Sequence, residues 1–318
     1  MTQENAQETV SQPLFSIVTP TFNRASLLPR LFESLCQQGD ASMEWVIIDD
    51  GSTDETAATV TDMMSRSPFP VTYRYQPNGG KHRALNHALD VASGYFFVDI
   101  DSDDYFLPDV LNGYAELWYS LPNEQRHRLA GMVADCVHVD GRVVGRPFPQ
   151  DGIVTNAIDL RAKLKVRGDK LYMYKIAIAR RFPSPEFDGE NFLHESVRHR
   201  RIASEFDLLA TTAAGRVKDY MDDGLSSESP GQMPNPLRNP KGYRLRTLEA
   251  VNFKAKENWR ELLKECANYV RFAFHCGVPL SIQFSEVKNK PLLVLSLPVG
   301  AVRYARDRSY IRRHRSAV

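Results

Sequence analysis

Short apolar runs alternate with amphipathic stretches along the first hundred residues of the chain. The runs are rich in β-branched and aromatic residues, which predicts strands. Between the runs, apolar residues recur three and four positions apart, most clearly in residues 27–35 and 84–92, which predicts helices. Strands that alternate with helices favour an α/β fold whose sheet is mostly parallel and is flanked by helices. The four expected strands are residues 15–19, 44–48, 71–75 and 95–100.

The pattern also places further elements. Ser52 and Glu55 have the spacing of a capping box, which predicts that a helix starts there after the second strand. Beyond residue 105 the alternation weakens. The elements expected in this part are a helix near residues 109–119, a strand at 132–139, a tight turn at 140–141 and a strand or short helix at 171–178.

Composition divides the chain into four segments. Residues 1–13 are polar and are expected to be a disordered lead-in. Residues 14–225 hold the α/β domain, and residues 226–242 are dense in Ser, Pro, Gly and Asn, which predicts a linker. Residues 243–318 predict a mainly helical C-terminal extension with a basic tail.

The apolar run at residues 291–302 is too short to cross a bilayer and is interrupted by a proline and a glycine. Six arginines follow between Arg303 and Arg315, against one acidic residue, Asp307. This composition fits a helix that lies in peripheral contact with an anionic membrane surface. It fits equally a helix that is docked on the core and has a solvated basic end.

Bulk composition excludes several classes of protein. The formal net charge is +1, which gives no reason to expect nucleic acid as a partner. The four cysteines lack the spacing of a zinc site or a disulfide framework, as expected for reduced thiols in the cytoplasm. The N-terminus lacks the basic and apolar regions of a secretion signal. We therefore expect a cytoplasmic protein, peripheral at the inner face of the cell membrane if the basic end binds lipid.

Polar and charged residues gather where the expected strands end, and ligands of parallel α/β sheets bind at these carboxyl ends. After the fourth strand, Asp101, Asp103 and Asp104 place three carboxylates within four residues. Such charges repel each other unless a cation offsets them, and Mg²⁺ or Mn²⁺ takes carboxylate oxygens while leaving positions for phosphate. A solvated turn would be the better explanation of the cluster alone. The companion strand ends favour a metal site.

Two of those companions suit a nucleotide. A carboxylate beside a base accepts a hydrogen bond from an imide nitrogen, which uracil has and cytosine lacks, so Asp50 is a candidate base reader. Helix capping at this strand end is assigned instead to Ser52 and Asp54. After the third strand, residues 79–83 combine two glycines with Lys81 and a further basic pair at a helix start, which suits phosphate. Neither GxxxxGK[ST] nor GxGxxG is present, which disfavours a Walker site and a dinucleotide-binding dehydrogenase.

Four motifs stand at the strand ends: TPTFNR at 19–24, VIIDDGSTDET at 46–56, GGKHRALN at 79–86 and DIDSDDYFLPD at 99–109. As an ordered set they resemble family 2 glycosyltransferases, over about residues 14–225. The resemblance implies the GT-A fold, with a Rossmann-like, mostly parallel sheet. It also implies an inverting enzyme that moves a sugar from a nucleoside-diphosphate sugar to an acceptor hydroxyl, in polysaccharide or glycolipid biosynthesis. The Asp50 argument favours UDP, although thymine and guanine also present an imide-type donor.

The resemblance also implies roles for individual residues. Asp103 and Asp104 are expected closest to the metal, with Asp101 facing the ribose. The residues expected to bind the nucleotide are Pro20, Thr21, Phe22, Asn23, Arg24, Asp50, Lys81 and Asp101.

An inverting transferase also needs a carboxylate that takes the proton of the acceptor hydroxyl. Family members carry it before an amphipathic helix, and Glu195 matches that position. Asp188 and Glu190 are the fallback candidates. Glu195 could instead pair with Arg198 or Arg200, and Glu190 could instead fix the loop.

A further pair of acidic residues, Asp222 and Asp223, could help close the metal site, but an acidic turn explains them at least as well. The expected partners are a nucleotide-sugar donor and a sugar or lipid-linked sugar acceptor.

Two other functions stay open. A sugar nucleotidyltransferase also uses an α/β sheet and aspartate-bound metal, but carries its glycine-rich basic loop directly after the first strand, where this chain has residues 19–22. The second open function is that of a catalytically inactive protein of the same fold that binds a nucleotide. The intact Asp50, Asp103, Asp104 and Glu195 argue against inactivity.

Overall fold

The computed structural model describes residues 12–219, 235–253 and 259–314. The strands are β1 (Phe15–Thr21), β2 (Met43–Asp49), β3 (Val71–Tyr75), β4 (Phe96–Asp99), β5 (Tyr105–Phe106), β6 (Leu129–His138), β7 (Ile153–Thr155), β8 (Lys170–Lys175) and β9 (Asp207–Lys218). The helices are α1 (Leu28–Cys36), α2 (Thr56–Arg66), α3 (Lys81–Val91), α4 (Val110–Ser120), α5 (Asn123–Arg128), α6 (Ala157–Ala162), α7 (Ile176–Ala179), α8 (Ser196–Ala203), α9 (Asn235–Arg238), α10 (Pro240–Phe253), α11 (Trp259–His275), α12 (Leu280–Glu286) and α13 (Lys290–His314).

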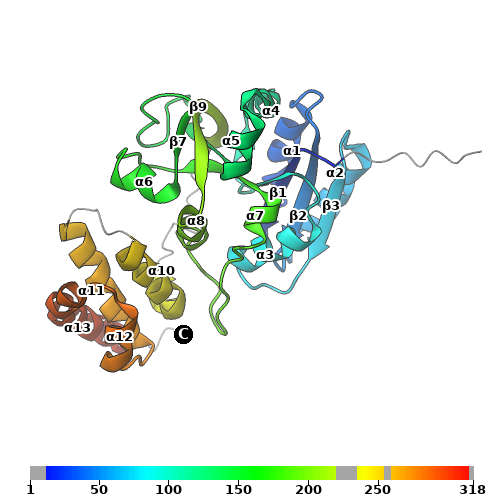
Figure 1. Cartoon of the computed structure of the whole chain (residues 1–318). Helices are drawn as coiled ribbons and strands as arrows, with labels where there is room; N and C mark the ends of the chain where they lie inside the picture. The colour runs from blue at the N-terminus through cyan, green and yellow to red at the C-terminus, as the bar shows by residue number, and fades with distance from the viewer. Residues whose placement is uncertain (1–11, 220–234, 254–258, 315–318) are drawn as a thin grey trace, which may run out of the picture.

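A nine-stranded sheet forms the centre of the molecule, in the order β3-β2-β1-β4-β8-β6-β9-β5, with β7 paired to β9 (Figure 1). The four predicted strands are present, and they pair in parallel. The later strands extend the sheet by antiparallel and parallel pairs. This mixed α/β architecture agrees with the predicted fold class.

The apolar runs of β1 and β2 are continuous because both faces of the sheet are covered, as in parallel sheets generally. Successive residues of a strand point to opposite faces. Ile17 of β1 accordingly packs with Leu31 of α1 on one face, whereas the adjacent Val18 packs with Leu85 of α3 on the other. The strand ends are thereby held between two helical layers.

The capping box predicted at Ser52 and Glu55 is wrong, because α2 begins only at Thr56. Ser52 instead bonds to the loop after β1, and the carboxylate of Asp54 accepts a bond from the Thr56 amide at 3.1 Å. Long-range bonds between two loops thus replace the local cap that the sequence spacing suggested.

The region predicted as a strand or short helix at residues 171–178 contains both, as β8 and α7. The extended helical segment predicted after the linker divides into α10 and α11, which pack against each other. Two short helical stretches, α9 and the start of α10, fall inside the predicted linker. Along the described residues, no helix combines the length and the apolar character that crossing a membrane requires.

Candidate active site

The loops that follow β1 and β2 are joined by side-chain hydrogen bonds. The amide of Asn23 donates to the Ser52 hydroxyl at 2.8 Å, and the Asn23 side chain accepts from the Thr53 amide at 2.8 Å. The amide of Ala25 donates to Asp54 at 3.2 Å. Asn23 has a positive φ of 52°, a conformation that Asn tolerates better than most residues. The motifs TPTFNR and DDGSTDET therefore form one connected wall at the carboxyl edge of the sheet.

The predicted nucleotide-binding residues of β1 lie differently along this wall. Pro20 and Thr21 belong to the strand itself and are buried. Phe22 is the first residue beyond the strand and exposes 46% of its surface. Arg24 is half-buried, and its amide donates to the Thr56 hydroxyl. Of these residues, Phe22 is thus the one that presents a large apolar side chain to solvent.

Asp50 is buried, and its carboxylate binds the loop that precedes α3. Its carboxylate accepts hydrogen bonds from Gln76 at 2.7 Å, from the Gly79 amide at 2.8 Å and from the Gly80 amide at 2.7 Å. The Asn78 side chain also donates to the Asp50 carbonyl at 2.8 Å. Asp50 therefore fixes the position of the glycine loop. A carboxylate offers about four acceptor sites, which leaves one for a ligand.

Gly80 lies against the loop that precedes the candidate base. Its φ is +94°, and a Cβ placed on it would lie 1.7 Å from the carbonyl oxygen of Asn191. Only glycine adopts this conformation without strain and allows such a close approach of two backbones. The motif that begins α3 is thus held directly beside the segment that leads to Glu195.

Lys81, the first residue of α3, lies between two carboxylates. Its ammonium contacts Asp101, and it lies 2.5 Å from the Glu195 carboxylate. Burial acts to lower the pKa of Lys81, but Asp101 and Glu195 hold it well above its ordinary value. Lys81 in turn lowers the pKa of Glu195 to about 2. The structure therefore brings the acidic cluster and the candidate base into contact with the same ammonium group.

Two cations from β9 complete the surroundings of the acidic cluster. Lys218 lies 2.8 Å from Asp104 and 3.3 Å from Asp101, and Arg216 lies 3.6 Å from Asp104. Both were missed in the sequence. Arg216 and Lys218 are two positions apart on a strand, so they point to the same face. Two basic residues in alternation at the end of this strand, with Val217 between them, are the signal that could have identified them.

The three aspartates differ in how much carboxylate they offer to a ligand. Asp104 is fully buried, and burial raises its pKa to about 6 although Arg216 and Lys218 oppose this. Burial also acts to raise the pKa of Asp101, but Lys81, Lys218 and Arg216 hold it well below its ordinary value. Within the described part of the chain, the carboxylate of Asp103 has no hydrogen bond or ion pair with another residue. Asp103 is therefore the most available of the three.

The cluster has a geometry that fits a hard divalent cation. One carboxylate oxygen from each of Asp101, Asp103 and Asp104 lies within 4.8 Å of the other two. Oxygen ligands of this kind suit Mg²⁺ and Mn²⁺. Asp101 and Asp104 form ion pairs with Lys218, whereas Lys218 acts on Asp103 only from a longer distance. The residues present thus fit the predicted metal, with Asp103 at the open side.

Glu195 immediately precedes α8, at the edge of an aromatic group. Its side chain keeps 42% exposure. His199, one turn further, stacks on Tyr172 at 4.0 Å and shares a hydrogen bond with the Tyr174 hydroxyl at 2.9 Å. Burial lowers the pKa of His199 to about 3, so it is neutral at physiological pH. The arrangement holds α8 on the sheet and leaves the Glu195 carboxylate at the surface of the site.

The alternatives considered for Glu195 find other partners. Arg198 donates to Ser184 and Asn86, and Arg200 donates to the carbonyl of Arg246. Among the described residues, Glu195 pairs with Lys81 and forms no ion pair with either arginine.

The fallback base Glu190 is bound to the C-terminal helices. Its two carboxylate oxygens accept from the amides of Lys241 at 2.7 Å and Gly242 at 2.8 Å, in the first turn of α10. It is therefore positioned as the loop anchor that the sequence left open. The carbonyl of Asp188 accepts from the Lys241 side chain at 2.9 Å. Asp222 and Asp223 lie outside the described residues.

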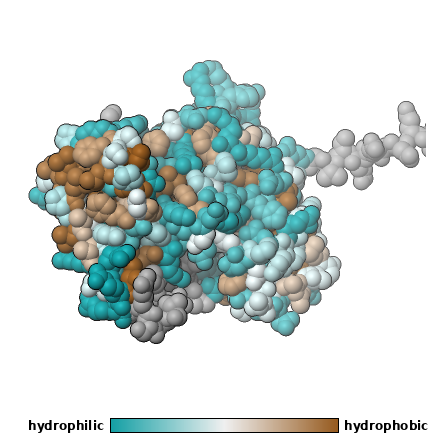
Figure 2. Space-filling view, turned by 90° about the horizontal axis from the view of Figure 1, so that it is seen from below, coloured by the Kyte–Doolittle hydropathy of each residue, from teal (hydrophilic) through white to brown (hydrophobic). Residues whose placement is uncertain are grey.

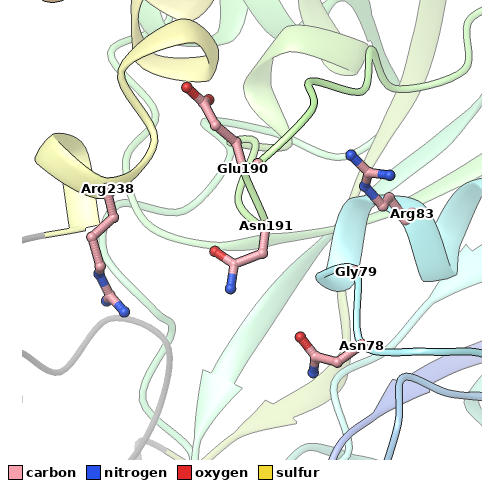
Figure 3. A pocket seen from close by; sticks show the side chains of 7 residues that line it. Asn78, Gly79, Arg83, Glu190, Asn191 and Arg238 are labelled. Carbon is pink, nitrogen blue, oxygen red and sulfur yellow. The ribbon is translucent and has the colours of Figure 1, made fainter.

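A polar pocket of about 410 Å³ lies between the loop before α3 and the loop that carries Glu190 and Asn191 (Figure 3). Asn78 and Gly79, which bond to Asp50, lie on one side of it, and Asn191 lies on another. Arg238 of α9 closes the far end, with its side chain extended along the pocket (Figure 3). The lining consists of amide and guanidinium groups, the acidic Glu190 and two glycines, so the pocket suits a polar ligand rather than a lipid.

Comparison with known proteins agrees with this geometry. Residues 16–124 match the model of glycosyl transferase family 2. A GalNAc(5)-diNAcBac-PP-undecaprenol beta-1,3-glucosyltransferase from Campylobacter jejuni is 33% identical over 271 residues, which cover 82% of this chain and 82% of that protein. A chondroitin synthase from Pasteurella multocida is 37% identical over 99 residues, but the match spans only 10% of the length of that synthase.

Solved structures show the same fold at low sequence identity. TarS of S. aureus (residues 1–349), solved in complex with UDP-GlcNAc, superposes with a TM-score of 0.62 at 18% identity, over 94% of this chain and 91% of that one. The mannosyltransferase PcManGT from Pyrobaculum calidifontis, solved with GDP-Man and Mn²⁺, gives a TM-score of 0.50 at 17% identity, over 94% of this chain and 88% of that one. The predicted resemblance and fold class are confirmed, and the chain belongs to glycosyltransferase family 2, with the GT-A fold.

Proposed function

We propose that this chain moves a sugar from a nucleoside-diphosphate sugar, with UDP as the favoured nucleotide, to a hydroxyl of a sugar acceptor with inversion at the anomeric carbon. The observation that carries this proposal is the position of Lys81 between Asp101 and Glu195. An inverting transfer needs a cationic, phosphate-binding end and a carboxylate base on opposite sides of the reacting carbon. Lys81 links Asp101, which is proposed at the diphosphate end, to Glu195, which is proposed as the base.

Glu195 is the proposed base. The acceptor oxygen bonds to the anomeric carbon as the bond from that carbon to the diphosphate oxygen breaks, and the acceptor proton passes to Glu195. The ion pair with Lys81 keeps this carboxylate ionised, but its pKa of about 2 makes it a weak proton acceptor. A diphosphate beside Asp101 offers Lys81 a third anionic partner in addition to Asp101 and Glu195. As the ammonium turns towards that partner, the basicity of Glu195 rises.

The proposed metal ligands are Asp103 and Asp104, with Asp101 between the metal and the ribose. Asp103 is the most accessible of the three, whereas Asp104 must share its carboxylate with Lys218. A divalent cation bound there would supply charge that stabilises the departing diphosphate. Arg216 and Lys218 keep the acidic cluster from repelling itself, so the site holds its shape before a cation binds.

The base end of the donor is assigned to the wall formed by Pro20, Thr21, Phe22, Asn23 and Arg24. Phe22 offers an exposed ring on which a base can stack. Asp50 holds Asn78 and Gly79, two residues that line the 410 Å³ pocket, and its carboxylate keeps one acceptor site for an imide N–H. Uracil has such a group, which supports UDP over CDP as the nucleotide.

The acceptor is proposed to be a sugar, free or lipid-linked, in the assembly of a polysaccharide or glycolipid. Support comes from the Campylobacter jejuni relative, whose name describes an undecaprenyl-diphosphate-linked acceptor. A lipid-linked acceptor would bring this chain to the inner face of the cell membrane. The family match and the named relatives favour glycosyl transfer over nucleotidyl transfer.

The first experiment is a screen of nucleotide sugars, with Mg²⁺ or Mn²⁺ present, for thermal stabilisation and for release of the nucleoside diphosphate. In Glu195→Gln, the donor should still stabilise the protein, and turnover should fall about 10²- to 10⁴-fold because the proton acceptor is lost. Glu205→Gln is the matched control, since Glu205 pairs with Arg181 at the other end of α8. Unchanged turnover in Glu195→Gln would remove Glu195 from the role of base. Pyrophosphate release from a nucleoside triphosphate and a sugar phosphate would overturn the proposed reaction.

A further inference from the structure

The C-terminal helix α13 has two faces of different character. Its inner face packs on α11, where Leu293 is fully buried and Gly300 lies against Val270. The same face carries Asp307, whose carboxylate accepts bonds from Arg271 at 2.5 and 2.7 Å. These contacts fix the rotation of α13, so the residues on its opposite side are held towards solvent.

The outer face exposes large apolar side chains over two turns. Val294, Leu295, Val299 and Val302 are 51%, 68%, 42% and 53% exposed. Other large apolar residues with comparable exposure are spread over the rest of the described chain, such as Met64 on α2 and Val154 on β7. Hydrophobic residues gather over the C-terminal helices at the left of the space-filling view, the side on which Figure 1 places α11 to α13 (Figure 2).

The apolar stripe continues into a basic one on the same face. Residues four, three, four, three and four positions apart on a helix share a face, and this spacing runs from Leu295 through Val299, Val302, Arg306 and Ser309 to Arg313. Arg312, one position before Arg313, is also exposed, as is Arg308 further round the helix. The one acidic residue of α13, Asp307, is turned inward. The described outer face therefore carries positive charge without exposed acid.

We propose that the outer face of α13 docks on the surface of an anionic lipid membrane, with Leu295, Val299 and Val302 in the interface and Arg306 and Arg313 at the headgroups. Apolar side chains together with a row of basic ones match such a surface. A second copy of this chain would present the same arginines to each other where the two helices run in parallel. The positive charge thus favours an anionic lipid surface over self-association.

The C-terminal helices are attached to the catalytic domain close to the candidate site, so contact of α13 with a membrane would affect how the site is oriented. The C-terminal helices are fastened to the candidate site by Glu190 at the first turn of α10 and by an ion pair of 2.7 Å between Glu249 of α10 and Arg201 of α8. Contact of α13 with a membrane would therefore set the orientation of the site towards that surface. The docking itself does not depend on which sugar is transferred.

The test is co-sedimentation of the full chain with vesicles of phosphatidylcholine alone or with 30% phosphatidylglycerol, without donor. We expect the chain to bind the anionic vesicles, and this binding should weaken when salt is added. Binding to the neutral vesicles should be weaker than binding to the anionic ones. Arg306→Gln combined with Arg313→Gln should lower the partition constant about thirtyfold, and Leu295→Gln about tenfold. The matched controls are Arg167→Gln and Met64→Gln, at exposed positions of the catalytic domain. They should bind as the unchanged chain does.

Two results would overturn the proposal. One is equal partition of the chain onto neutral and anionic vesicles, or no partition at all. The other is self-association in sedimentation velocity that Leu295→Gln abolishes while vesicle binding is absent, which would make the face a contact between copies. Because vesicle binding is measured without donor, a failure of the proposed glycosyl transfer would leave this test unaffected.

Discussion

Replacing Glu190 tests whether it anchors the loop before α8, as its contacts indicate, while Glu195 is the base. Its buried carboxylate accepts from the amides of Lys241 and Gly242, two donors in the first turn of α10 that have no partner within the helix. In the opposite direction, the side-chain oxygen of Asn239, just before α10, accepts hydrogen bonds from the amides of Asn191 and Phe192 at 3.0 and 3.1 Å. The two side chains clamp the loop before α8 to the C-terminal helices.

The cost of removing this anchor follows from the two bonds. Each hydrogen bond to a charged group contributes about 1.5–3 kcal/mol, and the carboxylate at the helix N-terminus adds about 0.3–1 kcal/mol. The effects are not fully additive, so Glu190→Ala should lower the free energy of unfolding by about 3–5 kcal/mol. Glu190→Gln keeps one acceptor without the charge and should cost about 1–2 kcal/mol.

The assay combines chemical denaturation with hydrogen exchange at the first turn of α10. Glu190→Ala should lose protection there, whereas Glu205→Ala, which removes an exposed ion pair, should change stability by less than about 1 kcal/mol. Turnover in Glu190→Gln should stay within about tenfold of the unchanged chain. If Glu190→Ala kept full protection and stability but abolished turnover, Glu190 would be the base and the assignment of Glu195 would be wrong.

Two further predictions concern the loop before α3. Gly80→Ala should destabilise the protein by at least about 2 kcal/mol in thermal melts, because φ is +94° and the new Cβ would meet the Asn191 carbonyl. Gly113→Ala in α4, where a Cβ meets nothing within 4 Å, should instead stabilise by about 0.5–1 kcal/mol; equal effects would refute the close approach. Lys81→Met should move the acid limb of the pH–rate profile upward, since the pKa of Glu195 is no longer held at about 2 and returns towards its ordinary 4.5. Lys163→Met, at an exposed ion pair, should leave that limb in place.

Local pattern was sufficient for the first half of the sheet. The apolar runs of β1 to β4 and the helical spacing of α1 and α3 are short-range signals, and the structure has these elements close to the predicted bounds. The grouping of Asp50, Lys81 and Asp101 at one edge was also predictable, because parallel strands end on the same side. Local pattern failed at Ser52, where bonds to Asn23, far away in sequence, override the capping box.

Tertiary structure decided what each charged residue does. The sequence offered Glu190 and Glu195 as similar candidates, and only the folded chain brings one to the α10 amides and the other to Lys81. It likewise brings Lys218 of β9 to Asp104, 114 positions earlier, through a strand order that no local pattern encodes. The sequence by itself thus determined the elements, the family and the acidic motif, because hydrophobic period and motif spacing act over a few residues. The partners of the carboxylates depend on contacts between distant strands, so the tertiary structure alone decided them.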